Sequence, residues 1–381
     1  METTDVLVIG GGPAGAAAAL TLTQAGRRCA VLEGRPAPEW KIGETLAPES
    51  RQLLLALGVW ESFLHAGHLP SPGLCSVWGD GGPVEKNFIF NPHGSAWQLD
   101  RAQFEAGLLA AAESAGTRVW RGCTAQTIQR TAGAADGRRW EVAAGDEIFR
   151  ATWLVDASGR GSVVARQLGV TRPAVDRLVA VYAVVAAPTG RDEDARTHLE
   201  ACAGGWWYSA LMPGGRRIFS FQTDADLLPD QQRWREAAWF WAQVDEAPLI
   251  RALLPSPNPA CTTVARLTSA NSSRPTACHG DGWVAVGDAA QSFDPLSGEG
   301  LFHALFSGQR AAQGVLQNLA GSTHGLAEYA ALSEALWRRF LHQRHIFYAS
   351  ETRWCGEPFW QRRLAPVAAP AQPMADFPMP A

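Results

Sequence analysis

Three glycines near the start of the chain have the spacing of a phosphate-binding loop, Gly10-x-Gly12-x-x-Gly15. In such a loop the first glycine permits a tight turn, the second lets a pyrophosphate approach the backbone, and the third allows a helix to pack closely on a strand. Further along the chain, the Glu33 carboxylate is placed where it can accept hydrogen bonds from ribose hydroxyls. Together these residues predict a dinucleotide site.

The elements around these glycines are the ones that this chemistry requires. Residues 5–9 form an apolar run of strand length, residues 16–22 predict an alanine-rich helix that ends near Gly26, and residues 29–33 form a second buried strand. This βαβ unit would direct the unpaired N–H groups and the positive dipole end of the helix toward the phosphates.

The rest of the chain contains both helical and strand patterns. Helices are predicted over 49–58, 101–115, 231–244 (rich in tryptophan) and 325–350, and from residue 300 onward. Strands are predicted over 178–187, 217–222 and 283–287, short strands and loops over 70–97, and a small meander over 118–155 that ends in a strand over 153–156.

Composition excludes several classes of protein. The 381 residues are 46% hydrophobic and 18% charged, which allows two or three domains with enclosed cores. The net charge of −4 argues against a general nucleic-acid binder, which needs a basic face. No apolar window is long enough for a membrane span, and the N-terminus enters a strand without a basic leader, so we expect a cytoplasmic protein.

Cysteine and lysine usage limits the other chemistry that is available. The seven cysteines are dispersed and form neither a CxxC pair nor a Cys/His cluster, so we expect reduced thiols and no metal site. Lysine occurs only at Lys41 and Lys86, so any lysine-dependent reaction has few candidates.

Two further segments follow predicted strands, Asp156-Ala-Ser-Gly-Arg-Gly-Ser162 and Gly287-Asp-Ala-Ala-Gln-Ser-Phe-Asp-Pro-Leu-Ser-Gly-Glu-Gly-Leu301. With the glycine loop, they make the chain resemble the FAD-dependent aromatic hydroxylases of the para-hydroxybenzoate hydroxylase fold and their flavin halogenase relatives. The resemblance covers residues 5 to about 314 and matches the middle region loosely. It implies an FAD cofactor. Since no second strand-flanked GxGxxG is present, it also implies that NAD(P)H binds transiently.

The resemblance implies roles for residues at the adenosine end of FAD. Glu33 would hold the ribose. The pyrophosphate would lie against Gly10, Gly12, Pro13, Ala14 and Gly15.

It also implies contacts at the flavin end. Asp288 would accept a hydrogen bond from a ribityl hydroxyl, while Lys41 and Arg101 resemble further FAD contacts. Backbone N–H groups of a loop would face N1 and O2 of the isoalloxazine, where reduced flavin is negatively charged. The loop residues are Pro295, Gly298, Gly300 and Leu301. Asp156 and Gly159 are expected to shape a loop rather than to take part in chemistry.

The implied fold class is α/β, with a discontinuous Rossmann-like FAD-binding domain, an antiparallel-sheet substrate domain and C-terminal helices. The FAD-binding domain would comprise residues 1–70, 98–177 and 271–320, and the substrate-binding domain residues 71–97 and 178–270. Residues 321–364 would form a C-terminal helical segment, and residues 365–381 a flexible Ala/Pro-rich tail.

The segment Trp40-Lys-Ile-Gly-Glu-Thr-Leu-Ala-Pro48 resembles the Gly-Glu loop of flavin halogenases, but three features depart from that class. Residues 42–85 contain no lysine that could relay hypohalous acid. Gly205-Trp-Trp-Tyr-Ser-Ala-Leu-Met-Pro213 replaces the Trp-x-Trp-x-Ile-Pro signature, and Leu296-Ser-Gly-Glu-Gly300 replaces a Glu-Ser-Thr-Gly-like loop. The resemblance therefore favours oxygen insertion into an electron-rich ring, through a flavin C4a-hydroperoxide formed with NAD(P)H and O₂.

Details over 91–101, 205–208 and 294–300 bring the chain nearest to the LodB- and GoxB-like flavoproteins that accompany quinone-cofactor oxidases. By that resemblance the substrate is an indole, the side chain of a tryptophan within a peptide or protein. Free tryptophan or another aromatic metabolite stays open as the substrate.

Six residues are candidates for contact with the substrate. Glu44 and His93 would be catalytic bases, although Glu44 is equally well explained as a structural carboxylate bonded to backbone N–H groups. The predicted substrate wall consists of Trp78, Trp97, Trp207 and Tyr208. Core packing is the alternative explanation for each of these aromatic residues.

Other functions stay open. A reductase or dehydrogenase similar to geranylgeranyl reductases would share the Pro-Leu-Ser-Gly-Glu-Gly loop and transfer hydride without oxygen. A halogenase relative that lacks the lysine is another alternative. A non-catalytic flavoprotein would bind FAD but would not oxidise NAD(P)H.

Overall fold

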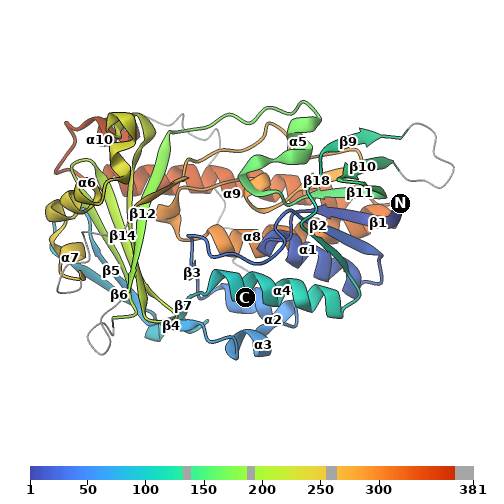
Figure 1. Cartoon of the computed structure of the whole chain (residues 1–381), viewed down its shortest axis with the longest axis horizontal. Coiled ribbons are helices and arrows are strands. Elements are labelled where there is room, and N and C mark those ends of the chain that lie inside the picture. The colour runs from blue at the N-terminus through green and yellow to red at the C-terminus, as the bar shows by residue number, and fades with distance from the viewer. Residues whose placement is uncertain (132–138, 187–193, 255–263, 365–381) are drawn as a thin grey trace.

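The computed structural model describes residues 1–131, 139–186, 194–254 and 264–364. Two sheets lie at opposite ends of the molecule, and long helices run between them (Figure 1). The predicted α/β class is confirmed, whereas the predicted tail over 365–381 lies outside the described residues. No helix in the described ranges is both long enough and apolar enough to cross a membrane.

The eight-stranded sheet is built around β1 (Glu2–Ile9), which pairs in parallel with β2 (Cys29–Glu33) and β11 (Glu147–Asp156). The last four residues of β1 are buried on both faces, as in a strand that is covered from both sides. β8 (Arg118–Arg121) extends the sheet beyond β2, and β18 (Trp283–Ala285) extends it beyond β11, both in parallel. The segments that follow β1, β11 and β18 therefore meet at one edge of the sheet.

Helices cover one face of this sheet and continue toward the second one. α1 (Pro13–Gln24) packs against α8 (Gly300–Leu319), and α8 packs against α9 (His324–Ala349). The approach of α1 to α8 depends on Gly308, because a Cβ there would lie 2.3 Å from the Ala14 carbonyl oxygen. Figure 1 shows that α9 extends from the first sheet to the second.

The seven-stranded sheet has β12 (Leu178–Ala186), β15 (Arg216–Asp224) and β14 (Gly205–Met212) as antiparallel neighbours. One face packs under the short helices α6 (Ala237–Ala242) and α7 (Pro248–Arg251), on the outer side of the molecule in Figure 1. The opposite face meets α9 and the segment that follows β2.

The remaining strands are short. β5 (Gly73–Val77) and β6 (Val84–Asn87) join the seven-stranded sheet beside β13 (Thr197–Cys202), and β16 (Arg266–Ser269) closes its other edge. A small third sheet consists of β3 (Thr45–Leu46), β7 (Ala96–Gln98) and β4 (Leu69–Ser71). The eight-stranded sheet also includes β9 (Thr127–Arg130), β10 (Trp140–Ala144) and β17 (His279–Gly280). The other helices are α2 (Ser50–Ala56), α3 (Trp60–Leu64), α4 (Arg101–Ser114), α5 (Val163–Gln167) and α10 (Pro358–Leu364).

Two sequence-based expectations for these elements are wrong. Residues 231–244 do not form one helix, because the backbone at Glu236 is extended (ψ 125°) and separates a 3₁₀ segment from α6. Within α6, Phe240 and Trp241 are both buried in the core on the outer face of the seven-stranded sheet. The meander is restricted to β9, β10 and β11, since β8 pairs in parallel with β2 instead.

Candidate functional site

The glycine loop joins β1 to α1 at the carboxyl edge of the eight-stranded sheet. A Cβ at Gly10, whose φ is +108°, would lie 2.3 Å from the Ala157 carbonyl oxygen, and a Cβ at Gly15 would lie 2.0 Å from the Gly10 carbonyl oxygen. Glycine is therefore required at both positions. A Cβ at Gly12 would meet no protein atom within 4 Å. The open space beside Gly12 fits a pyrophosphate.

Pro13 is the first residue of α1, where its missing N–H leaves no helical hydrogen bond unmade. Ala14 is buried against Gly287, where a Cβ would lie only 2.7 Å from the Ala14 Cβ. The start of α1 is therefore in direct contact with the segment that follows β18.

Glu33 lies at the end of β2, beside the glycine loop. Its carboxylate accepts hydrogen bonds from the Gly11 N–H (2.7 Å, Oε2) and from the Arg35 N–H (2.9 Å, Oε1). These bonds orient the carboxylate and leave lone pairs that could accept from ribose hydroxyls.

Asp156 shapes the loop after β11. Its buried carboxylate accepts hydrogen bonds from the Ser158 hydroxyl (2.5 Å), the Val164 N–H (2.9 Å) and the Ala165 N–H (3.1 Å). It thereby caps α5 and folds the turn through Gly159, which has φ +67°. Burial raises the pKa of the Asp156 carboxyl. All of its contacts are internal to the loop, in agreement with a structural role.

Asp288 follows β18 and is partly exposed. Its carboxylate lies 3.5 Å from the Arg160 guanidinium, so the loops after β11 and β18 are paired by charge. A second arginine, Arg172, which no sequence motif singles out, donates hydrogen bonds to the carbonyl oxygens of Asp288 (2.7 Å) and Ala289 (2.8 Å). Arg172 thus fixes the backbone at Asp288 and Ala289, and with it the position of the Asp288 side chain.

The loop before α8 is held by Asp294, whose Oδ1 accepts a hydrogen bond from the Leu296 N–H (3.0 Å). Gly298 has φ +65°, a conformation that favours glycine, and α8 begins at Gly300. The exposed loop residues are Pro295, Gly298, Glu299 and Gly300, whereas Leu301 is buried against the core. A helix N-terminus with an exposed glycine backbone suits the N1 and O2 side of an isoalloxazine.

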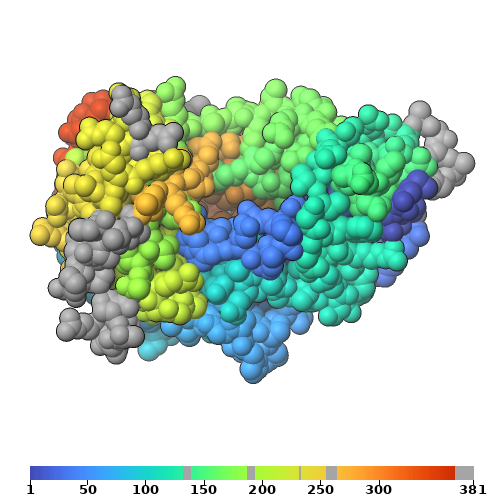
Figure 2. Space-filling view, in the orientation of Figure 1, coloured from blue at the N-terminus to red at the C-terminus, as the bar shows by residue number. Residues whose placement is uncertain are grey.

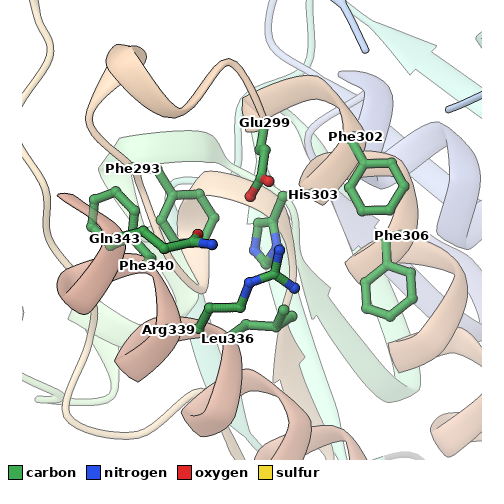
Figure 3. Close-up of a pocket in the computed structure, with 9 residues that line it drawn as sticks. All are labelled: Phe293, Glu299, Phe302, His303, Phe306, Leu336, Arg339, Phe340 and Gln343. Carbon is green, nitrogen blue, oxygen red and sulfur yellow. The ribbon is translucent and has the colours of Figure 1, made fainter. Parts of the chain in front are cut away.

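A crevice between α8 and α9 adjoins this loop (Figure 3). In Figure 3 Glu299, the residue before α8, and Arg339 of α9 point into it from opposite sides, with His303 of α8 between them. His303 is 6% exposed, its Nε2 has no hydrogen-bond partner among the described residues, and burial lowers its pKa to about 4. The apolar lining is Phe293, Phe302, Phe306, Leu336 and Phe340. Figure 3 thus shows the Glu299 side chain directed across the crevice toward α9.

Arg101 and Lys41 meet at one carboxylate, that of Glu105. Arg101 Nη2 lies 2.5 Å from Glu105 Oε1, and Lys41 Nζ lies 2.5 Å from Oε2 of the same residue. Arg101 also donates to the Gly43 carbonyl oxygen, while its buried Nε has no partner in the described part of the chain. Arg101 is thus anchored under the segment that follows β2. No sequence motif singles out Glu105.

The segment that follows β2 occupies the middle of the face shown in Figure 2, between the two sheets. Trp40 and Ile42 pack on the seven-stranded sheet against Tyr182 and Met212. Two residues beyond Ile42, Glu44 is 0% exposed.

The Glu44 carboxylate and Tyr208 of β14 are hydrogen-bonded to each other. Tyr208 donates to Glu44 Oε1 (2.6 Å), and the Gly43 N–H donates to Oε2 (2.9 Å). Burial raises the pKa of Glu44, and the hydrogen bonds partly oppose that rise. The Tyr208 oxygen also lies 2.7 Å from Thr45 Oγ1, which donates to Gln98 Oε1 (2.8 Å). The structure therefore brings together two of the six predicted substrate contacts.

His93 lies apart from this pair. It occupies the loop before β7, where its N–H donates to Asn91 Oδ1 (2.9 Å) and its buried Nδ1 has no partner among the described residues. Asn91 in turn donates to Glu49 (3.1 Å), at the start of α2. Within the described ranges, no hydrogen bond or ion pair joins His93 to Glu44.

Trp97 and Trp78 belong to aromatic clusters. Trp97 packs edge-on against Phe63 (5.1 Å) and Trp60 (6.2 Å) of α3, which fits the core-packing explanation, and its place in the substrate wall stays a prediction. Trp78 donates its indole N–H to the Phe347 carbonyl oxygen (2.8 Å) and packs against Trp206.

Trp207 lies in the core under α6, and the structure does not bring it to the face of β14 that carries Tyr208. It is 0% exposed and lies between Phe221 (5.1 Å) and Phe240 (5.3 Å), on the face of β14 that α6 covers. Consecutive strand residues point to opposite faces, so Trp206 shares the face of Tyr208, and Trp207 does not. The pattern Trp-Trp-Tyr does not reveal which of its residues face the core.

Comparisons with known proteins agree with this geometry. The family model described as FAD binding domain matches residues 3–332. The FAD-dependent oxidoreductase LodB of Marinomonas mediterranea is 30% identical over 369 residues, which cover 96% of this chain and 98% of LodB.

Two solved structures are similar over most of the chain. The peptidyl tryptophan dihydroxylase QhpG, which is essential for tryptophylquinone cofactor biogenesis, is 25% identical with a TM-score of 0.78, over 99% of this chain and 82% of QhpG. The myxobacterial chondrochloren halogenase CndH shares the fold at 24% identity, with a TM-score of 0.83 over 95% and 86% of the two chains.

The family match spans all three loops at the edge of the eight-stranded sheet, and the space at Gly12 and the exposed backbone before α8 fit FAD. The chain belongs to the FAD binding domain family and is an FAD-dependent oxidoreductase of the flavin halogenase and monooxygenase superfamily.

Proposed function

We propose that this protein is an FAD-dependent monooxygenase that hydroxylates the indole ring of a tryptophan within a peptide or protein. Two relatives support this proposal, since LodB is similar over nearly its whole length and QhpG acts on peptidyl tryptophan. The observation that most directly supports a proton-handling site is the buried pair of Glu44 and Tyr208, between the two sheets.

The residues of the three loops would hold FAD. The loop with Gly10, Gly12 and Gly15 would leave space for the pyrophosphate. Glu33 would accept hydrogen bonds from the ribose, and Asp288 would accept one from the ribityl chain. Bound FAD, reduced by NAD(P)H, would supply the activation of O₂. In the balanced reaction a ring C–H becomes C–OH, the second oxygen atom leaves as water, and NAD(P)H supplies two electrons.

Glu44 would receive the proton that the ring loses when its aromaticity is restored. A carboxyl whose pKa is raised by burial is a better base than an exposed one, and Tyr208 would hold it in place by donating to Oε1. β3 follows Glu44 directly and packs against α8, so this carboxylate stands close to the helix that follows the flavin loop. His93 is the second candidate base.

The positions of the lysines disfavour halogenation. Lys41 is paired with Glu105, and Lys86 lies on the edge strand β6 with its Nζ 5.8 Å from the Phe88 ring. These contacts of the two lysines support oxygen insertion over a lysine-dependent halogenation.

The proposal is tested by incubating the FAD-loaded enzyme with NAD(P)H, ¹⁸O₂ and tryptophan-containing peptides, with free tryptophan in parallel and bromide in one arm. Incorporation of ¹⁸O into a peptide indole is expected. Turnover that proceeds equally well without oxygen would refute the proposal and indicate a reductase. A brominated product would replace it with a halogenase, and a product only from free tryptophan would refute the peptide substrate.

A further inference from the structure

A buried chain of hydrogen bonds joins the loop before α8 to the seven-stranded sheet. It begins at Asp294, the residue that precedes the loop, which is 1% exposed. Besides accepting from the Leu296 N–H, the Asp294 carboxylate accepts from the Tyr348 hydroxyl (2.8 Å) and from Arg344 Nε (3.1 Å). The position of the loop therefore depends on two side chains of α9.

Tyr348 continues the chain toward the sheet. It is 0% exposed, and its oxygen accepts a hydrogen bond from Trp206 Nε1 (3.0 Å). An indole N–H can only donate, so the single Tyr348 hydrogen is directed to Asp294. All the bonds in the chain therefore have one direction, from Trp206 through Tyr348 to Asp294.

The sheet end of this chain lies beside the proposed substrate contacts. Trp206 is two residues before Tyr208 on β14 and shares its face of the sheet. Arg344 also pairs with Asp176 (3.1 Å), which accepts from the Leu178 N–H at the start of β12 (3.0 Å). Two strands of the sheet are thus tied through α9 to the same carboxylate.

We propose that Tyr348 is a positioning residue that couples the seven-stranded sheet to the flavin loop, so that a displacement of β14 at Trp206 is transmitted to the Asp294–Leu301 backbone. The inference rests on the proposed placement of FAD beside this loop. It does not depend on the substrate or on the reaction type.

The test compares Tyr348→Phe with Tyr329→Phe. Tyr329 is a matched control, because it is a buried tyrosine of the same helix whose hydroxyl donates to the Ala285 carbonyl oxygen (2.7 Å), away from the loop. Hydrogen exchange of the Leu296 amide in the FAD-free protein reports directly on the bond to Asp294. Titration with FAD reports on the loop as a ligand site.

In Tyr348→Phe the Leu296 amide is expected to exchange about fivefold faster, and FAD is expected to bind about fivefold more weakly, since a buried hydrogen bond contributes about 1 kcal/mol and about 1.4 kcal/mol would be tenfold. Tyr329→Phe is expected to leave both within about twofold while lowering the free energy of unfolding by a similar amount. Equal effects of the two variants on Leu296 exchange and on FAD affinity would overturn the proposal.

A second variant tests the sheet end of the chain. Trp206→Phe keeps the Tyr348–Asp294 bond, so a smaller change in the same direction is expected. In the double variant the two effects should be non-additive. Full additivity would show that Trp206 does not act through Tyr348 and would overturn the coupling. Because apo-protein exchange needs neither turnover nor substrate, a failure of the proposed hydroxylation would leave this test unaffected.

Discussion

Tyr208 donates a hydrogen bond to the buried carboxylate of Glu44, with 2.6 Å between the two oxygens, although the residues are 164 positions apart in the chain. The bond joins the segment that follows β2 to the face of the seven-stranded sheet. It offsets part of the cost of burying a carboxylate, which has few other donors. The pair therefore connects the FAD-binding part of the molecule to the proposed substrate sheet.

Removal of the Tyr208 hydroxyl should weaken both activity and stability. Tyr208→Phe takes a donor from Glu44, so the pKa of Glu44 should rise further and the acid limb of the activity profile should move to higher pH. The free energy of unfolding should fall by about 2 kcal/mol, the range for bonds to charged groups. Tyr182→Phe is the control, since Tyr182 packs on Trp40 of the same segment. An unchanged acid limb would contradict the prediction.

Glu44→Gln distinguishes a role of Glu44 as a catalytic base from a role as a structural carboxylate. If Glu44 receives the ring proton, product formation should fall by about 10²–10⁴-fold while FAD affinity changes by less than about threefold. FAD titration and single-turnover product analysis measure the two effects. Loss of FAD binding and stability together would instead assign Glu44 a structural role.

Glu44 should also make stability depend on pH. Burial raises the pKa of its carboxyl in the folded state, so the folded protein holds this proton at a pH where the unfolded chain has lost it. Its contribution is therefore fully present below the ordinary carboxyl pKa and is lost as pH rises through the raised value. Urea unfolding across that window should show a smaller decline for Glu44→Gln than for the natural protein. Identical declines would argue against the raised pKa.

His303 should make stability depend on pH in the opposite direction. Its folded pKa of about 4 lies below its usual value, so the unfolded chain takes up the proton first as pH falls. Stability should then fall between about pH 6.5 and 4, with up to about 3 kcal/mol attributable to His303. His303→Leu should reduce this dependence in denaturant titrations, whereas replacement of the exposed His342 by Gln should not.

Gly12→Ala should affect ligand binding without affecting the fold. An added Cβ would meet no protein atom within 4 Å, so the FAD-free variant should unfold at the same denaturant concentration as the FAD-free natural protein. The methyl group would occupy the space assigned to the pyrophosphate, and FAD affinity should fall by about tenfold or more. Gly82→Ala, also in open space, should change neither property. If Gly12→Ala binds FAD as tightly as the natural protein does, the pyrophosphate does not lie beside Gly12.

Local sequence determined the nucleotide-binding part of this protein. The glycine spacing, the βαβ pattern and the strand before Gly287 predict β1, α1, β2 and β18, because a buried parallel strand and a close helix crossing each require particular residues at adjacent positions. Asp156 was recognised as a loop-shaping residue for the same reason, since all its partners lie within nine positions.

Only the tertiary structure decided which of the remaining residues meet. The sequence pattern does not determine which residues of β14 face the core. The sequence therefore predicts Trp207 in the substrate wall, whereas the structure buries it under α6 and leaves Trp206 and Tyr208 on the other face. Glu44 with Tyr208, and Asp294 with Tyr348 and Trp206, are pairs between distant segments. Such contacts depend on how the sheets and helices pack together, and residue spacing along the chain carries no record of that packing.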